Sequence, residues 1–318
     1  MPGDDPDGYD LLLGHVLAPQ AAARAVEDAG LRAVTAAPLI DDADPAKSER
    51  ACSDAERNLE RVREAAGGLA RPGLAPHAIS TLSEESLRWV AERSAELDVP
   101  VQIHLSETED EVEHCLAEHG ARPAHVLDRV GMLGPRTILA HGTWLDRSEL
   151  DLIAARGATI VTNPVANLKL AVGRVFPYPE ARDAGVELGL GTDGPGSNNS
   201  LDLLADAKAF ALLQKNEARD LTVIDAAEVL GIATGRRSAI LGGRGLEEGA
   251  PADFLLVLRD DPALALGELD AGLVYAASGS VVDTTVVAGR VLMQGGVVED
   301  SDRIVTRARE RAAGLGLA

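Results

Sequence analysis

The sequence lacks several features that would each point to a particular class of protein. Only two cysteines, Cys52 and Cys115, occur among its 318 residues, so we expect buried free thiols, neither a disulfide framework nor a cysteine zinc site. No apolar run approaches the roughly 18 residues that a membrane-spanning helix needs. The N-terminal stretch MPGDDPDGYD also lacks the basic and then apolar order of a signal peptide. These absences predict a cytoplasmic protein without a membrane partner.

Positive charge is scarce as well. The formal net charge is -21, and no cluster of lysine and arginine interrupts the acidic balance. Nucleic acids and anionic membranes both need a cationic surface that releases counterions. The sequence therefore predicts that no nucleic acid is a partner.

The composition and the order of segments indicate one large α/β domain. Apolar residues make up 46% of the chain and charged residues 25%, which is ordinary for a globular protein. Apolar, β-branched runs that predict strands begin near residues 10, 33, 74, 101, 138, 160 and 187, and helical patterns lie between them. This alternation predicts a parallel array of the TIM type, a (β/α) barrel in which seven of the usual eight strands are visible.

The last part of the chain has a different texture. After helices expected at residues 201–216, 222–230 and 233–241, a strand is predicted at 253–258 and a hairpin at 281–298 that turns at Gly289 and Arg290. A closing helix is expected at 301–313. We therefore divide the chain into an acidic lead-in (1–9), a barrel (10–243) and a β-rich appendage resembling half of a small sandwich (244–318).

Polar side chains recur at the ends of the predicted strands. His77, His104, His141 and Asp193 each stand where a buried strand emerges, and Glu107 follows His104 by three residues. In a barrel the ends of different strands meet at one mouth, so these five side chains are expected to converge. Imidazoles with a carboxylate suit zinc or a similar divalent ion, and a nearby glutamate suits proton transfer.

Each of these residues also has a structural interpretation. A single histidine on an apolar strand is commonly a core or loop-anchoring residue, and His114, His119 and His125 are read as that or as solvated side chains. Asp193 could cap the helix that opens near Leu201, and Glu107 could be a first-turn acid favoured by the helix dipole. The recurrence at strand ends favours a functional site for the five residues together.

Several blocks of sequence resemble the amidohydrolase superfamily in order and spacing. The resemblance is strongest to the deaminases of methylthioadenosine and S-adenosylhomocysteine and to the related triazine chlorohydrolases. It extends from about Asp10 to the C-terminal helix. The blocks are GLAPHAI, VQIHLSETEDEVE, ILAHGTWLD, NPVANLKLAVG and GLGTDGPGSNNSLD.

The resemblance implies a role for each candidate residue. His104 matches a metal-ligand histidine, and Asp193 matches the aspartate that is both metal ligand and base. His141 matches the histidine that holds the hydrolytic water, Glu107 the acid that carries a proton to the ring nitrogen, and His77 a histidine that contacts the substrate. The metal implied is zinc, with iron as the alternative.

Two departures from the family pattern are visible. The family places a His-x-His pair on its first strand, whereas His15 stands alone here, so we expect the chain to begin at the family's second strand. With only His104 and Asp193 as assigned ligands, the affinity for the metal should be low unless a complementing N-terminal fragment supplies further ligands. The exposed strand edges also favour a homo-oligomer. Near His77, Ile79, Ser80 and Leu82 replace the usual Pro, Tyr and Cys, which bears on nucleoside specificity.

The sequence therefore predicts a metal-dependent hydrolase that deaminates an amino-substituted heterocycle of the adenosine type. Two alternatives stay open. One is a catalytically incomplete member, or one part of a split enzyme. The other is a deaminase or chlorohydrolase of a triazine, pterin or other heterocycle.

Overall fold

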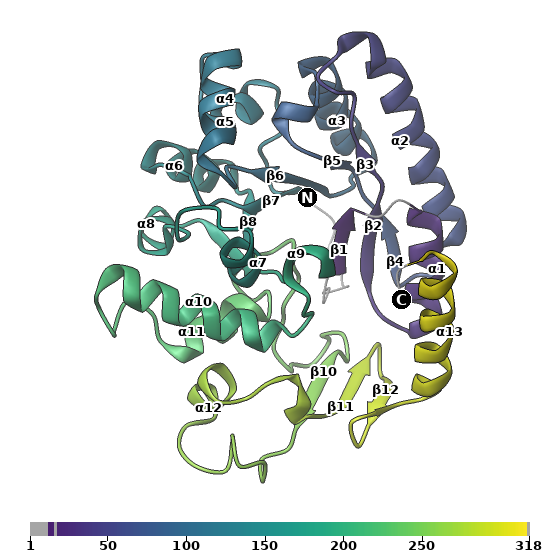
Figure 1. Cartoon of the computed structure of the whole chain (residues 1–318), viewed down its shortest axis with the longest axis vertical. Helices are drawn as coiled ribbons and strands as arrows, with labels where there is room; N and C mark the ends of the chain where they lie inside the picture. The colour runs from purple at the N-terminus through teal and green to yellow at the C-terminus, as the bar shows by residue number, and fades with distance from the viewer. Residues whose placement is uncertain (1–11, 16–17, 317–318) are drawn as a thin grey trace.

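Parallel strands form the inner layer of the molecule (Figure 1). The computed structural model describes residues 12–15 and 18–316. The strands of this layer are β1 Leu12–His15, β2 Ala33–Ala36, β3 Pro38–Leu39, β4 Ala70–Pro72, β5 Ala75–Pro76, β6 Val101–Leu105, β7 Thr137–His141, β8 Thr159–Thr162 and β9 Glu187–Leu190.

The strands neighbour one another in chain order. β1 pairs with β2 and β2 with β4, β3 pairs with β5, and β6 to β9 form one four-stranded sheet, all in parallel. A bridge between Leu74 and Val101 joins the two halves. β2 continues into β3 and β4 into β5, so the strands occupy the seven positions that the sequence predicts. Within the described ranges no ladder joins β1 to β9.

Helices cover the outside of the strand layer (Figure 1). The helices of the described part of the chain are α1 Pro19–Ala29, α2 Pro45–Ala65, α3 Glu84–Leu97, α4 Glu109–His119, α5 Pro123–Arg129, α6 Arg147–Arg156, α7 Pro164–Lys169, α8 Tyr178–Ala184, α9 Pro195–Asn198, α10 Leu203–Ala218, α11 Ala226–Ala233, α12 Leu269–Tyr275 and α13 Ser301–Gly314, with single 3-10 turns at Ile79–Thr81 and Gly279–Val281. None of the helices in the described part of the chain is long and apolar enough to cross a bilayer.

Strand β6 shows how the sequence orients its side chains. Val101, Ile103 and Leu105 are buried against the helices, whereas Gln102 and His104 alternate with them and are only partly buried. This period of two places His104 on the face opposite the helical core. Each fully buried leucine of that core contributes about 1.5–3 kcal/mol.

The C-terminal strands form a separate antiparallel sheet in the order β10 Phe254–Val257, β11 Val282–Val287, β12 Arg290–Gln294 and β13 Val297–Val298. Val287 pairs with Arg290, so the first hairpin turns at Ala288 and Gly289, one residue earlier than predicted. Both turn residues have positive φ (49° and 74°), as a type I′ turn requires. This sheet confirms the predicted β-rich C-terminal part.

Two contacts fasten this sheet to the start of the strand layer. The Arg32 Nε donates to Asp253 Oδ2 at 2.7 Å, and both side chains are almost fully buried. Gly30, which ends α1 with φ 76°, lies against Leu292, whose side chain would be 2.7 Å from a Cβ at that position. Val274 of α12 also belongs to the main hydrophobic core. Residues beyond 243 therefore pack on the barrel, and the boundary between 243 and 244 stays a prediction.

The prediction of a helix at 233–241 is wrong. α11 ends at Ala233 and is followed by turns, because Gly235 adopts φ 70° and the chain folds back so closely that a Cβ on Gly243 would collide with the Thr234 carbonyl. α11 also begins later than expected, at Ala226, where the Asp225 side chain caps it by accepting the Glu228 N–H. The short helices α7, α8, α9 and α12 were not predicted.

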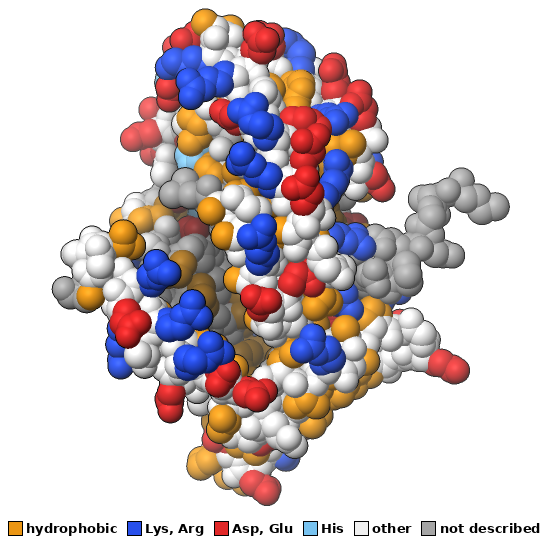
Figure 2. Space-filling model, turned by 90° about the vertical axis from the view of Figure 1, so that its right-hand side faces the viewer, with side chains coloured by type: hydrophobic (Ala, Val, Ile, Leu, Met, Phe, Trp, Pro, Cys, Tyr) orange, Lys and Arg blue, Asp and Glu red, His pale blue; other side chains and the backbone are white. Residues whose placement is uncertain are grey.

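The C-terminal sheet leaves apolar side chains exposed. Figure 2 shows mixed acidic and basic side chains on the face over α2, with hydrophobic side chains along the lower part of the molecule. Leu255, Val291 and Val297 of the sheet and Ile304 of α13 are each more than half exposed. We call these four residues the exposed C-terminal apolar residues.

Candidate functional site

His104 lies at the end of β6, beside His77 from the loop after β5. Its Nδ1 is 2.8 Å from the His77 carbonyl oxygen, which can only accept, so Nδ1 carries the proton and Nε2 the lone pair. The two rings meet edge to face with centroids 5.0 Å apart. The His77 Nδ1 is in turn 3.1 Å from the Thr81 hydroxyl.

His141, the last residue of β7, stacks on His104 with ring centroids 5.4 Å apart. Its side chain is buried and is oriented by two asparagines after β8. The Nδ1 donates to the Asn167 Oδ1 at 2.8 Å, while the Asn163 amide nitrogen lies at the longer distance of 3.4 Å. The shorter bond keeps the proton on Nδ1 and leaves Nε2 as the acceptor.

Glu107 completes this group from the loop between β6 and α4. Its Oε2 lies 3.7 Å from the His141 Nε2, and the side chain is about one quarter exposed. The backbone before and at Glu107 is held by Glu111, whose two carboxylate oxygens accept the N–H groups of Ser106 and Glu107, each at 2.8 Å. An acid is therefore presented to solvent beside a buried imidazole.

Asp193 lies in the turn after β9. Its Oδ1 accepts the Gly194 N–H at 2.5 Å, and its charge acts on His104. The turn is supported by Asn198, whose amide donates to the Thr192 carbonyl at 2.8 Å and to the buried Asp206 at 3.0 Å. Asp193 therefore shares the strand-end rim with the histidines, and its carboxylate holds the backbone of its own turn.

Three of these segments have a left-handed backbone. Ser106, His141 and Asp193 have φ of 50°, 72° and 60°, a region that residues other than glycine rarely occupy. Such conformations cost of order 1–3 kcal/mol each and are found at functional sites more than elsewhere. At each of them the strand ends abruptly, so the side chains here or next to it turn towards the rim.

Burial sets the charge states of the group. Burial lowers the pKa of His104 to about 4, and the neighbouring His141 imidazole acts in the same direction, while Asp193 opposes them. His104 is therefore a neutral imidazole near neutral pH. Burial raises the pKa of Glu111, and the two N–H groups that it accepts work against that increase.

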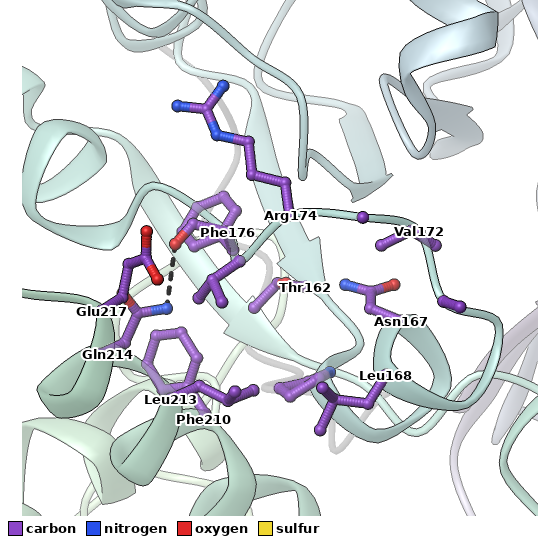
Figure 3. Close-up of a pocket in the computed structure, with 14 residues that line it drawn as sticks. Thr162, Asn167, Leu168, Val172, Arg174, Phe176, Phe210, Leu213, Gln214 and Glu217 are labelled. Atoms are coloured by element: carbon purple, nitrogen blue, oxygen red, sulfur yellow. Dashed lines mark hydrogen bonds between the residues drawn. The ribbon is translucent and has the colours of Figure 1, made fainter.

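A cavity of about 330 Å³ adjoins the group on the side of β8 (Figure 3). Thr162 and Asn167 point into it, the rings of Phe176 and Phe210 form its wall, and Arg174 extends away from it. Asn167 is shared, because its oxygen holds His141 while its side chain lines the cavity. The Thr162 hydroxyl is buried and finds no hydrogen-bond partner among the residues that the structure describes.

The structure thus gathers His77, His104, His141 and Glu107, and it places Asp193 on the same rim. Their catalytic and binding roles stay predictions. His114 is exposed, and the His125 ring contacts the Ser148 hydroxyl outside the group, as the structural interpretation predicts. Sequence reasoning missed Asn163, Asn167 and Glu111. The spacing NPVAN directly after a predicted strand was the available signal for the two asparagines.

The donors present are of the type that zinc prefers. His104 offers a neutral imidazole whose Nδ1 is already bonded to a carbonyl, the usual arrangement of a metal-binding histidine, and Asp193 offers a carboxylate. Among the residues that the structure describes, however, no three His, Cys, Asp or Glu side chains are placed to hold one ion together. The described set therefore fits the chemistry of a metal site but supplies fewer than the usual three protein ligands.

Comparison with known families identifies the class of protein to which this fold belongs. A model of the amidohydrolase family matches residues 7–292, so the chain belongs to that family. This confirms the resemblance seen in the sequence.

Curated relatives share much of the sequence. A 5'-deoxyadenosine deaminase of Methanoregula boonei is 46% identical over 93% of this chain and 68% of its own length. A 5-methylthioadenosine/S-adenosylhomocysteine deaminase of Haloarcula marismortui is 40% identical over 92% of this chain and 69% of its own length. The chain thus spans about two thirds of the length of these relatives.

Solved structures agree on the fold. An adenosine deaminase from Xanthomonas campestris with bound zinc is 31% identical, has a TM-score of 0.86, and is matched over 96% of this chain and 71% of its own. An atrazine chlorohydrolase from Arthrobacter aurescens, complexed with zinc, has a TM-score of 0.83 at 24% identity over 94% and 72% of the two chains. The second likeness shows the fold alone.

Proposed function

We propose that this amidohydrolase removes the amino group of an adenosine-type nucleoside by hydrolysis. One observation carries the proposal: an acid, Glu107, stands beside His141, which stacks on His104. Relatives named as deaminases of 5'-deoxyadenosine and of methylthioadenosine support the substrate class. Each turnover adds water to the carbon that bears the amine and releases ammonia.

Each residue of the site has a separate role in this reaction. Glu107 donates a proton to the ring nitrogen next to the reacting carbon, and Asp193 accepts a proton from the attacking water. His141 orients that water through Nε2, because Nδ1 is committed to Asn167. His77 contacts the substrate. Such proton transfers typically contribute about 10²–10⁴-fold to the rate.

We propose that His104 and Asp193 hold a divalent cation, zinc in preference to iron. A cation at this rim would supply an acidified water as nucleophile near neutral pH. A further ligand is needed, and the His-x-His pair of the family is the proposed source, supplied by a complementing N-terminal fragment. Metal analysis of the protein with and without that fragment tests this, and equal binding by wild type and by H104N/D193N would contradict it.

Ammonia release from a panel of substrates tests the proposed reaction. The panel holds 5'-deoxyadenosine, methylthioadenosine, S-adenosylhomocysteine and an amino-substituted triazine, assayed with zinc and the complementing fragment. We expect nucleoside turnover that E107Q reduces by at least about a hundredfold. Glu109→Gln is the matched control, because Glu109 is an exposed acid two residues away. Turnover of the triazine alone would contradict the substrate class, and no turnover would favour a catalytically incomplete chain.

We also propose that two copies of the chain associate through the exposed C-terminal apolar residues. Exposed leucine, valine and isoleucine side chains on one sheet and one helix support this. Light scattering should give a dimer that V291E converts to a monomer. A monomeric wild type would contradict the proposal.

A further inference from the structure

We propose that Glu111 is a positioning residue whose carboxylate fixes the turn on which Glu107 meets the substrate. The proposal rests on the proposed function only for the role of Glu107. It begins from one carboxylate that receives two successive backbone N–H groups, those of Ser106 and Glu107, each at 2.8 Å. Successive N–H groups that converge in this way form an anion-binding concavity.

The turn needs such a support because its backbone is in a rare conformation. Ser106 is fully buried and has φ 50°, and no glycine is present to relieve it. On the side of β7 the turn is tied by the Trp144 N–H, which donates to the Ser106 carbonyl at 2.8 Å. On the side of α4 its N–H groups are tied by Glu111. Without Glu111 the two N–H groups lose their acceptor, and the turn can relax away from His141.

The geometry distinguishes Glu111 from the other acids of the same segment. Glu109, Asp110 and Glu113 are exposed on α4, whereas Glu111 turns inwards to the strand end. Its own N–H is bonded to the Thr108 hydroxyl at 3.2 Å, which anchors the first turn of the helix. Glu111 therefore connects the helix start to the loop that carries the acid.

Glu111→Gln is the first test, because the amide keeps the shape but places an NH₂ group against a backbone N–H. We expect kcat to fall by about a hundredfold, the effect of a small misplacement of a reacting group, while KM changes by less than about threefold. Glu27→Gln is the matched control. The Glu27 Oε1 also accepts backbone N–H groups, those of Gly67, Leu69 and Ala70, but between α1 and β4. It should lower the melting temperature and leave kcat unchanged.

A double-mutant cycle separates positioning from general damage. If Glu111 acts through Glu107, E107Q/E111Q should be no slower than E107Q alone. Full additivity of the two losses would overturn the proposal. If E107Q itself turns over at the wild-type rate, the proposed role of Glu107 has failed. The role of Glu111 is then decided by amide NMR, which needs no substrate.

Amide NMR of the full chain supplies that measurement without any substrate. The Ser106 and Glu107 amide protons should lie downfield in the wild type and move upfield in E111Q, while E27Q leaves them in place. Unchanged shifts in E111Q would overturn the proposal. Should E111Q fail to fold, hydrogen exchange of the wild type decides: slow exchange at both amides supports the proposal, and exchange as fast as in an open loop refutes it.

Discussion

The bond between His141 and Asn167 should decide which nitrogen of His141 carries the proton. In the structure a buried Nδ1–H donates to the Asn167 oxygen at 2.8 Å. Asn167→Leu keeps much of the volume and removes that acceptor. The only other polar neighbour that the structure gives Nδ1 within the described residues is the Asn163 amide nitrogen at 3.4 Å, which is a donor and favours the opposite tautomer.

The size of the effect follows from the cost of an unsatisfied buried donor, about 1–3 kcal/mol. At about 1.4 kcal/mol per factor of ten, the Nδ1–H tautomer should lose a factor of roughly 5 to 150 relative to its alternative. The Nε2 would then carry a proton towards Glu107 and could no longer accept from water. We expect kcat to fall by a comparable factor in N167L.

Nitrogen-15 NMR of the imidazole rings measures the tautomer directly, and ammonia release measures the rate. Asn167→Asp is the control, because a carboxylate oxygen still accepts from Nδ1 and the wild-type tautomer should persist. The reasoning is refuted if N167L keeps the proton on Nδ1, or if it changes tautomer without any loss of rate.

Three further outcomes follow from the structure. Asp253→Asn leaves Arg32 buried without its charged partner and should lower the free energy of unfolding, measured in urea, by about 3–5 kcal/mol. Asp42→Asn removes the partner of Lys47 in an exposed pair and should lower it by less than about 1 kcal/mol. Equal losses in the two variants would contradict this. Burial raises the pKa of Cys115 to about 12, so the native thiol should resist a disulfide reagent at mildly alkaline pH and react once urea unfolds the chain; rapid native labelling would refute it. Burial lowers the pKa of His104 to about 4, so its contribution to stability is complete above the ordinary pKa near 6.5 and is lost as the pH falls towards 4. Between these pH values the free energy of unfolding of metal-free H104N should therefore fall by up to about 3 kcal/mol less than that of the metal-free wild type. Parallel pH curves for the two proteins would contradict this.

The strand ends could be predicted from the sequence because a parallel array has a simple rule. Each buried strand shows as an apolar run, and a polar residue at its end must lie on the common rim. His104 and His141 follow that rule, and their rings stack in the structure. Asp193 also reaches the rim, although the sequence could not reveal that its carboxylate accepts the next backbone N–H.

The supporting residues could not be predicted, because nothing in the local pattern separates them from their neighbours. Glu111 stands in the run ETEDEVE, where any acid suits the first turn of a helix, and only the left-handed turn at Ser106 selects it. Helix α7 was missed for a similar reason, because its Pro164 and Asn167 and the Asn163 before it are typical of a loop. The helix expected after Ala233 failed because the close contact at Gly243 arises between turns and not within a period.

The left-handed residues at the rim place thermal stability and catalytic rate in opposition. Glycine at position 106 would adopt φ 50° without strain, so selection for heat resistance alone should favour it. The same change would free the neighbouring peptide to sample other shapes, and the acid that follows would be aimed less accurately. A more robust variant obtained in this way should therefore be a slower enzyme.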